Sequence, residues 1–103
     1  MNFAAFAHLP GAELVLPGLR DAAAGRLTVG SCLVSMAQPT LEQSGLLHEF
    51  PQLVYVDEPE RALYRLLQQE GANAYGRYNS LLRRLTSFER SLRSQCARDS
   101  VRS

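Results

Sequence analysis

Apolar side chains recur every three or four residues through the last third of this 103-residue chain. They are Tyr75, Tyr78, Leu82, Leu85, Phe88 and Leu92. This spacing places them on one side of an α-helix. A helix over residues 73–95 is about 35 Å long at 1.5 Å per residue. Such a long apolar seam has to be covered by the rest of the chain or by another molecule.

Three shorter stretches upstream have the same helical spacing, at residues 11–24, 28–37 and 57–71. Pro17 lies inside the first stretch. Because proline lacks the N–H that a helix interior needs, we expect a kink or a restart of that helix near Leu16. Thr28 and Asp57 have the short polar side chains preferred at helix N-caps, so we expect the other two helices to begin there.

Two weaker signals lie between these helices. Thr40-Leu41-Glu42-Gln43 has the form of a capping box, which predicts a short helix from Thr40 to about Leu47. Residues 53–56 are Leu, Val, Tyr and Val, which favour a strand. The sequence offers no evident second strand to satisfy their peptide groups. We therefore expect an extended, buried connector at 53–56.

Together these patterns predict an all-α fold, a small bundle of four to five helices with a long C-terminal helix. A chain of 103 residues fits one domain, so we expect residues 1–103 to form a single helical domain. Residues 1–9 would be an N-terminal arm. Residues 97–103 are polar and would form a frayed tail.

The basic side chains are concentrated towards the C-terminus. All 11 are arginine, and the net charge of the chain is +1. Residues 72–103 carry seven arginines and two acids, net +5, whereas residues 1–71 carry four arginines and eight acids, net −4. Either the two parts neutralise each other in the fold, or the basic helix is a binding surface.

A cluster of tyrosines and arginines on this helix is the candidate interaction surface: Tyr75, Arg77, Tyr78, Arg83, Arg84 and Arg90. Aromatic and guanidinium groups are typical of protein–protein hot spots. They also stack on bases and bind phosphates. The simplest interpretation is structural, with the tyrosines packed on the seam and the arginines in solvent.

The sequence indicates no catalytic, cofactor-binding or metal-ligating residues. Cys32 and Cys96 have no second Cys or His at zinc-ligand spacing. No Gly-x-Ser-x-Gly motif or glycine-rich phosphate loop is present. We expect a protein that is not an enzyme and takes no cofactor. A pocket gathering His48, Tyr55 and Tyr64 would argue otherwise.

Residues 11–37 also have the outline of a helix-turn-helix, with Gly25-Arg26-Leu27 as the turn. The second helix of such a motif reads DNA through side chains that bond base edges. Here that helix has only Ser31 and Ser35 as candidates. We therefore do not expect DNA recognition by this element.

The leading functional expectation is a protein-interaction module, most simply a homodimer in which the C-terminal helices or the 28–37 helices meet their own copies. The alternative is RNA or DNA binding through the arginine-bearing face of the C-terminal helix. The N-terminal residues lack the pattern of a signal peptide, and no apolar run reaches the ~18 residues of a membrane span. We expect a cytoplasmic protein without a membrane partner.

Overall fold

The computed structural model describes the backbone of residues 6–45 and 52–102 and the side chains of residues 6–45 and 52–98. Five α-helices, and no strand, occur in these ranges. They are α1 (Ala12–Ala23), α2 (Val29–Met36), α3 (Gln38–Ser44), α4 (Pro59–Glu70) and α5 (Ala74–Arg102). The predicted all-α fold with a long C-terminal helix is confirmed.

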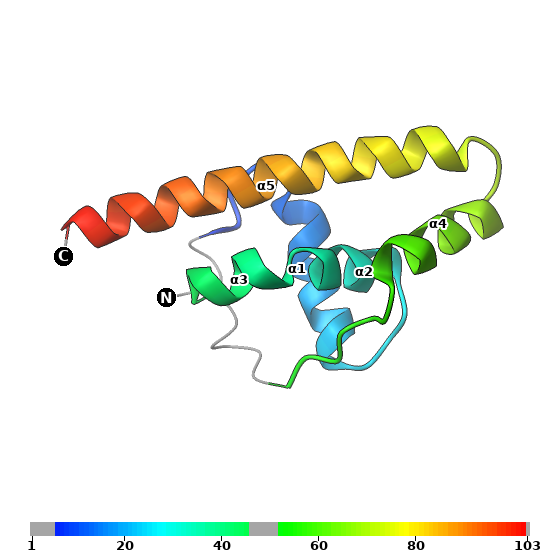
Figure 1. The fold of residues 1–103 in the computed structure, drawn as a ribbon, viewed down its shortest axis with the longest axis horizontal. Coiled ribbons are helices and arrows are strands. Elements are labelled where there is room, and N and C mark those ends of the chain that lie inside the picture. Colours follow the sequence, from blue (N-terminus) through cyan, green and yellow to red (C-terminus); the bar gives the residue numbers. More distant parts are fainter. Residues whose placement is uncertain (1–5, 46–51, 103) are drawn as a thin grey trace.

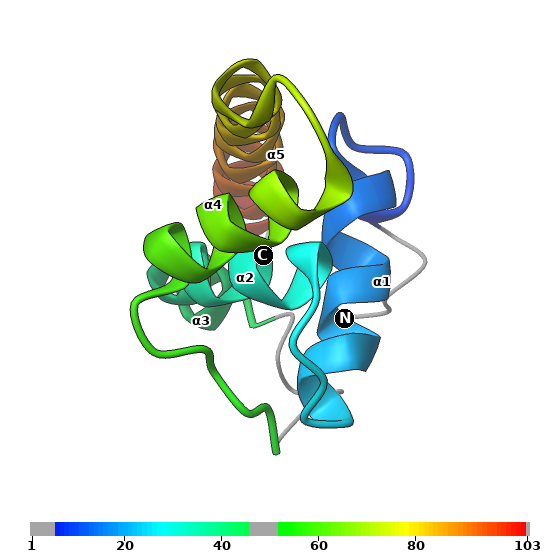
Figure 2. The same ribbon diagram turned by 90° about the vertical axis from the view of Figure 1, so that its right-hand side faces the viewer.

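The long helix α5 runs along the 47 Å axis of the molecule, and the other helices lie on one side of it (Figure 1). α1 runs crosswise to α5, whereas α2, α3 and α4 lie beneath α5 (Figures 1 and 2). α5 packs on α1, α3 and α4, and α2 packs on α1 and α4. One side of α5 is therefore covered by its own chain.

α1 and α2 cross through a direct contact between two glycines. A Cβ atom on Gly18 would lie 2.3 Å from the carbonyl oxygen of Gly30, and a Cβ atom on Gly30 would lie 2.8 Å from the Cα of Gly18. No side chain fits at either position, so the crossing depends on glycine in both helices. This close approach places α2 deep in the fold, where residues 31–35 are all buried.

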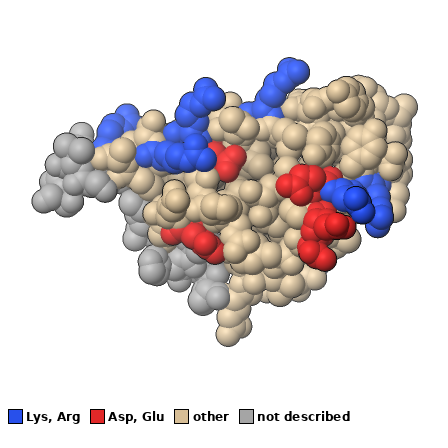
Figure 3. All heavy atoms as spheres, in the orientation of Figure 1, with Lys and Arg blue, Asp and Glu red and all other residues tan. Residues whose placement is uncertain are grey.

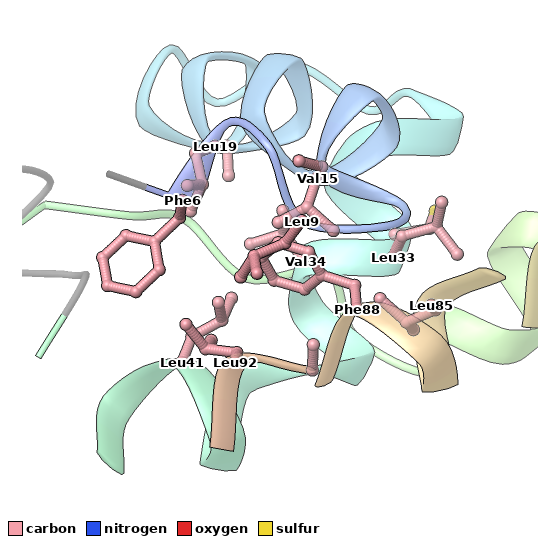
Figure 4. Close-up of a cluster of buried hydrophobic side chains, with 14 of the residues drawn as sticks. Phe6, Leu9, Val15, Leu19, Leu33, Val34, Leu41, Leu85, Phe88 and Leu92 are labelled. Carbon is pink, nitrogen blue, oxygen red and sulfur yellow. The ribbon is translucent and has the colours of Figure 1, made fainter. Parts of the chain in front are cut away.

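The hydrophobic core gathers side chains from all five helices and from the N-terminal arm (Figure 4). Its largest fully buried members are Phe6, Val15, Leu19, Leu33, Val34, Leu41, Leu63, Leu67, Phe88 and Leu92. In the arm, the backbone N–H of Leu9 donates to the carbonyl of Phe6 at 3.1 Å, and both side chains are buried. The arm therefore packs as a turn on the body from Phe6 onwards, while residues 1–5 lie outside the described part.

The α5 seam is buried at Leu85, Phe88 and Leu92, as predicted. At the start of the helix the prediction is wrong, because Tyr75 is 71% exposed. Ala74, Tyr78 and Leu81 pack against the core there, and Leu82 is not among the residues of the core. The observed seam keeps the spacing of three and four residues. It contains Ala74 in place of Tyr75 and Leu81 in place of Leu82.

The predicted N-cap of α2 is confirmed. The Thr28 hydroxyl accepts a hydrogen bond from the backbone N–H of Ser31 at 3.1 Å. In return, the Ser31 hydroxyl accepts from the backbone N–H of Thr28 at 2.9 Å. This reciprocal pair satisfies two donors at the start of the helix.

The other two predicted caps are wrong. α3 begins at Gln38, so Thr40 lies inside that helix rather than at its start. α4 begins at Pro59 and is preceded by Glu58, not Asp57, as its N-cap. Proline is favoured at the first helical position because its missing N–H is not needed there, and this preference sets the start of α4.

Helix ends also differ from the predictions. α1 continues through Pro17, so of the two outcomes expected near Leu16, a kink or a restart, the restart does not occur. Packing of the buried face of α1 offsets the one helical hydrogen bond that proline removes. α3 ends at Ser44, and its predicted end at Leu47 lies outside the described residues. α5 remains helical to Arg102, well beyond residue 95.

Residues 53–56 form a connector without regular secondary structure. The backbone N–H of Val54 donates to the carbonyl of Ala22 at 3.0 Å, and that of Val56 donates to the Ser35 hydroxyl at 2.8 Å. The Val54 side chain is 57% exposed. The expected burial holds only in part, because Leu53, Tyr55 and Val56 pack against the core whereas Val54 does not.

Replacing Gly18 or Gly30 by alanine should destabilise the fold strongly. A new Cβ would meet backbone atoms of the facing helix, which cannot move aside as a side chain can. We expect each variant to lose roughly 3 kcal/mol or more of unfolding free energy, measured by denaturant titration. Gly76→Ala is the matched control, since its Cβ would meet only the Asn73 side chain. Equal effects at all three positions would contradict the glycine-contact explanation.

Candidate interaction surface

The six residues of the predicted surface all lie on α5, but three of them are engaged within the chain. Arg77 Nη2 lies 2.5 Å from Glu70 Oε2 in α4. Arg84 Nη2 donates to Glu13 Oε1 in α1. The Tyr78 ring packs edge-on against Tyr64, with ring centroids 5.7 Å apart and planes at 74°.

The other three predicted residues, Tyr75, Arg83 and Arg90, are exposed on the opposite side of the helix. They share this side with neighbours at helical spacing. We call this surface the α5 outer face, and it consists of Tyr75, Asn79, Leu82, Arg83, Thr86 and Arg90. A shallow hollow runs along most of it, lined by Asn79, Leu82, Arg83, Thr86, Ser87 and Arg90.

The α5 outer face carries positive charge only. Arg83 and Arg90 form no ion pair with any residue that the structure describes. Within residues 74–98 the sole acid is Glu89, which accepts a hydrogen bond from Thr40 of α3. Arginines line the upper edge of the molecule along α5, and most acidic groups visible in this view lie lower (Figure 3).

A second hollow of about 270 Å³ lies between α3 and α5, and the sequence did not predict it. The buried Thr40 hydroxyl donates to Glu89 Oε2 and accepts from Arg93 Nη2, each at 3.0 Å. The i, i+4 spacing of Glu89 and Arg93 signals a helical pair. Nothing in the sequence signals that Thr40 comes between them. Cys96 lines the same hollow, with its thiol 3.9 Å from the Ser44 carbonyl oxygen.

Tyr55 and Tyr64, two of the three residues considered for a catalytic pocket, lie in the described part of the chain. His8 is exposed near the N-terminus, and His48 lies outside the described residues. Burial raises the pKa of Tyr55, with a further rise from the charge of Glu42. The hollows along α5 contain neither Tyr55 nor Tyr64.

In the described ranges, no three His, Cys, Asp or Glu side chains are close enough to hold a metal ion. Neither Cys32 nor Cys96 is in a disulfide, and burial raises the pKa of the Cys32 thiol. A protonated, buried thiol is a poor nucleophile. None of the described helices is both long enough and apolar enough to cross a bilayer.

The helix-turn-helix outline is present as α1, a turn at Gly25 and α2. Its second helix is enclosed by the fold, since Ser31 and Ser35 are buried with the residues between them. Ser35 also uses its hydroxyl to donate to the Ser31 carbonyl at 2.8 Å. α2 therefore presents no side that could enter a DNA groove.

Comparison with known proteins gives no assignment. The chain matches no known family, and no curated protein or solved structure is significantly similar to it. Functional arguments therefore depend on the surfaces described above.

The Glu13–Arg84 pair gives a pH-dependent link between α1 and α5. The hydrogen bond from Arg84, and then that from the backbone, lower the pKa of Glu13 below its ordinary 4.5. A lowered pKa means that the pair stabilises the fold above pH 4.5, and that this contribution is lost as the pH falls through the lowered value. Because both side chains are exposed, the contribution is small.

In Arg84→Gln, we expect the Glu13 pKa to return towards its ordinary value, as followed by NMR titration of the side-chain carboxyl carbon. The neighbouring Arg83→Gln variant is the control, since Arg83 makes no ion pair with Glu13. An unchanged Glu13 titration in Arg84→Gln would show that the pair does not form in solution.

Proposed function

We propose that this protein is a non-enzymatic interaction module and that the α5 outer face binds its partner. One observation carries the proposal. A 71% exposed tyrosine, Tyr75, shares a helix face with two arginines, Arg83 and Arg90, that have no acidic partner among the described residues. Other arginines on the same helix, Arg77 and Arg84, do have such partners.

The chemistry of this face suits a protein with acidic side chains. Tyrosine and arginine are the residue types enriched in interface hot spots. A guanidinium group binds a carboxylate through two parallel hydrogen bonds, which gives orientation as well as affinity. The half-buried Leu82 lies between Tyr75 and Arg90 and adds apolar area that a partner could cover.

A second copy of the chain fits this face less well. The expected homodimer relied on an uncovered seam, but α1, α3 and α4 pack on α5. The 28–37 helix was the other expected contact, and its central residues are buried. Two α5 outer faces meeting each other would bring Arg83 and Arg90 against like charges, which disfavours association. Self-association stays a prediction, to be sought on a different surface.

Nucleic-acid binding by the same face is the second candidate. Arg83 and Arg90 are seven residues apart, about 10 Å along the helix. The carboxylate between them in the sequence, Glu89, accepts a hydrogen bond from Thr40 on the side of α3. Tyr75 could stack on an unpaired base. Two phosphate contacts predict a slope of log affinity against log salt of about −1.4 for a single strand.

A cytoplasmic location belongs to the same proposal. It is supported by Cys32 and Cys96, which form no disulfide. Unpaired thiols persist in the reducing cytosol, whereas secreted proteins tend to use them in disulfides.

Binding should be tested with two fluorescent probes, a Glu- and Leu-containing helical peptide and a single-stranded RNA, by anisotropy at several salt concentrations. In Arg83→Glu/Arg90→Glu we expect at least a tenfold loss of affinity for the peptide, about 1.4 kcal/mol. Tyr75→Ala should weaken binding without changing stability, because that side chain is mostly in solvent.

The charge-matched control is Arg61→Glu/Arg65→Glu on α4, where both residues are exposed. Equal losses in the two double variants would mean that only net charge matters and would contradict a specific α5 surface. Loss of RNA binding, with no peptide binding by the unmodified protein, would favour the second candidate.

A further inference from the structure

The α5 outer face is made of three rows, each containing two residues seven positions apart. Seven residues are almost two turns of an α-helix, so the two members of a row lie nearly in line along the helix, about 10 Å apart. The apolar, the uncharged polar and the basic row are, in this order, Tyr75 with Leu82, Asn79 with Thr86, and Arg83 with Arg90. The face therefore has a seven-residue repeat.

The three rows lie side by side around the helix. At about 100° of rotation per residue, they follow one another in the order apolar, polar, basic. Leu82 is half-buried and borders the covered side of α5, where Tyr78 packs against Tyr64. Arg83 and Arg90 are exposed on the side that faces away from the body. The face therefore has an apolar edge next to the body and a basic edge in solvent.

This spacing favours a helical partner over an extended one. A partner that matches the rows has to repeat its side chains about every 10 Å along one line, and an α-helix does so at every seventh residue. In an extended chain, side chains on one side recur about every 6.7 Å, which does not match the rows. A seven-residue repeat is also the pattern by which two helices pack side by side at a small crossing angle.

The charge of the rows determines the chemistry of the partner. Neither Arg83 nor Arg90 has an acidic partner among the described residues, so each can bind a carboxylate of another molecule. The apolar row requires apolar side chains beside those carboxylates. A nucleic acid would leave Leu82 uncovered, and two cations are few beside the roughly 6–10 phosphate contacts of a strongly salt-dependent DNA-binding protein.

We infer that the partner of the α5 outer face is an acidic, amphipathic α-helix that lies along α5. Two of its acidic residues, seven positions apart, bind Arg83 and Arg90, and an adjacent apolar row covers Tyr75 and Leu82. The inference rests on the proposed function, because it describes the partner of the same face. From Tyr75 to Arg90 the face is about 23 Å long, which corresponds to about four turns of a partner helix.

Two matched peptides of about 21 residues test this inference by fluorescence anisotropy with the full chain. Each has two leucines seven residues apart and two glutamates seven residues apart. On α5 the basic residue directly follows the apolar one, as in Leu82-Arg83. A Leu-Glu order in the peptide therefore fits an antiparallel partner, and a Glu-Leu order fits a parallel one.

Two control peptides separate a helical match from general acidity. The offset control has the composition of a matched peptide but has its glutamates five residues apart, which turns them about 140° away from each other around the helix. The second control has a proline at the middle of a matched peptide, which breaks the helix. We expect at least one matched peptide to bind at least tenfold more tightly than either control.

Charge reversal tests whether the glutamates meet the predicted arginines. Arg83→Glu/Arg90→Glu should lose the binding of the matched peptide, and a peptide with arginines in place of both glutamates should restore it. Arg61→Glu/Arg65→Glu should bind the matched peptide as the unmodified chain does. Loss of binding without rescue by the reversed peptide would contradict direct pairing of the charges.

The outcomes distinguish this inference from the proposed function. Equal binding of matched, offset and proline peptides would overturn the helical partner, while the proposed function would stand if Arg83→Glu/Arg90→Glu abolished that binding. Binding of single-stranded RNA and of no peptide would refute the acidic helix in favour of a nucleic acid. If the unmodified chain bound none of these probes, both proposals would fall.

Discussion

The contact between Gly18 and Gly30 sets how closely α1 and α2 approach, and the depth of α2 in the fold depends on it. With backbone against backbone, α2 lies near enough to α1 for its residues 31–35 to be enclosed. α4 then packs on α2, and α5 packs on α4. A side chain at either glycine would separate the first two helices and leave the others without a continuous surface to cover.

Where α1 meets α5, a second close approach of the two backbones accompanies an ion pair. A Cβ on Gly11 would lie 2.6 Å from the Arg84 carbonyl oxygen, and the Arg84 side chain reaches Glu13. The neutralisation that the uneven charge suggests therefore occurs at some arginines of α5 and not at others. Arg77 and Arg84 neutralise acids of the body, while Arg83 faces away from it.

The sequence predicts this fold well where a signal is local and repeated. The α2 cap and the buried part of the α5 seam depend on residues a few positions apart, and both are confirmed. The seam prediction is wrong at its start because Tyr75 and Ala74 both fit a helical spacing, and only the neighbouring helices determine which faces inward. The prediction placed Tyr75 on the seam because its side chain is larger than that of Ala74, and this was incorrect.

The candidate surface could be predicted only in part, for a similar reason. Half of the six proposed residues are engaged by partners from elsewhere in the chain, and the Arg84–Glu13 pair joins residues 71 positions apart. Thr40 meets Glu89 over 49 positions. No helical spacing reports such contacts, because they form only when distant helices pack. The sequence identified the C-terminal helix as basic. It did not identify which arginines of that helix would lack an acidic partner.

The two inward hydrogen bonds of residues 53–56 have a thermodynamic consequence. Ala22 and Ser35 hold this segment from two different helices, so its backbone is already fixed when the chain folds. Ordering these four residues costs about 1–2 kcal/mol of backbone entropy per residue. The two hydrogen bonds offset part of that cost, so the segment links α1 to α2 only while both helices stay packed together.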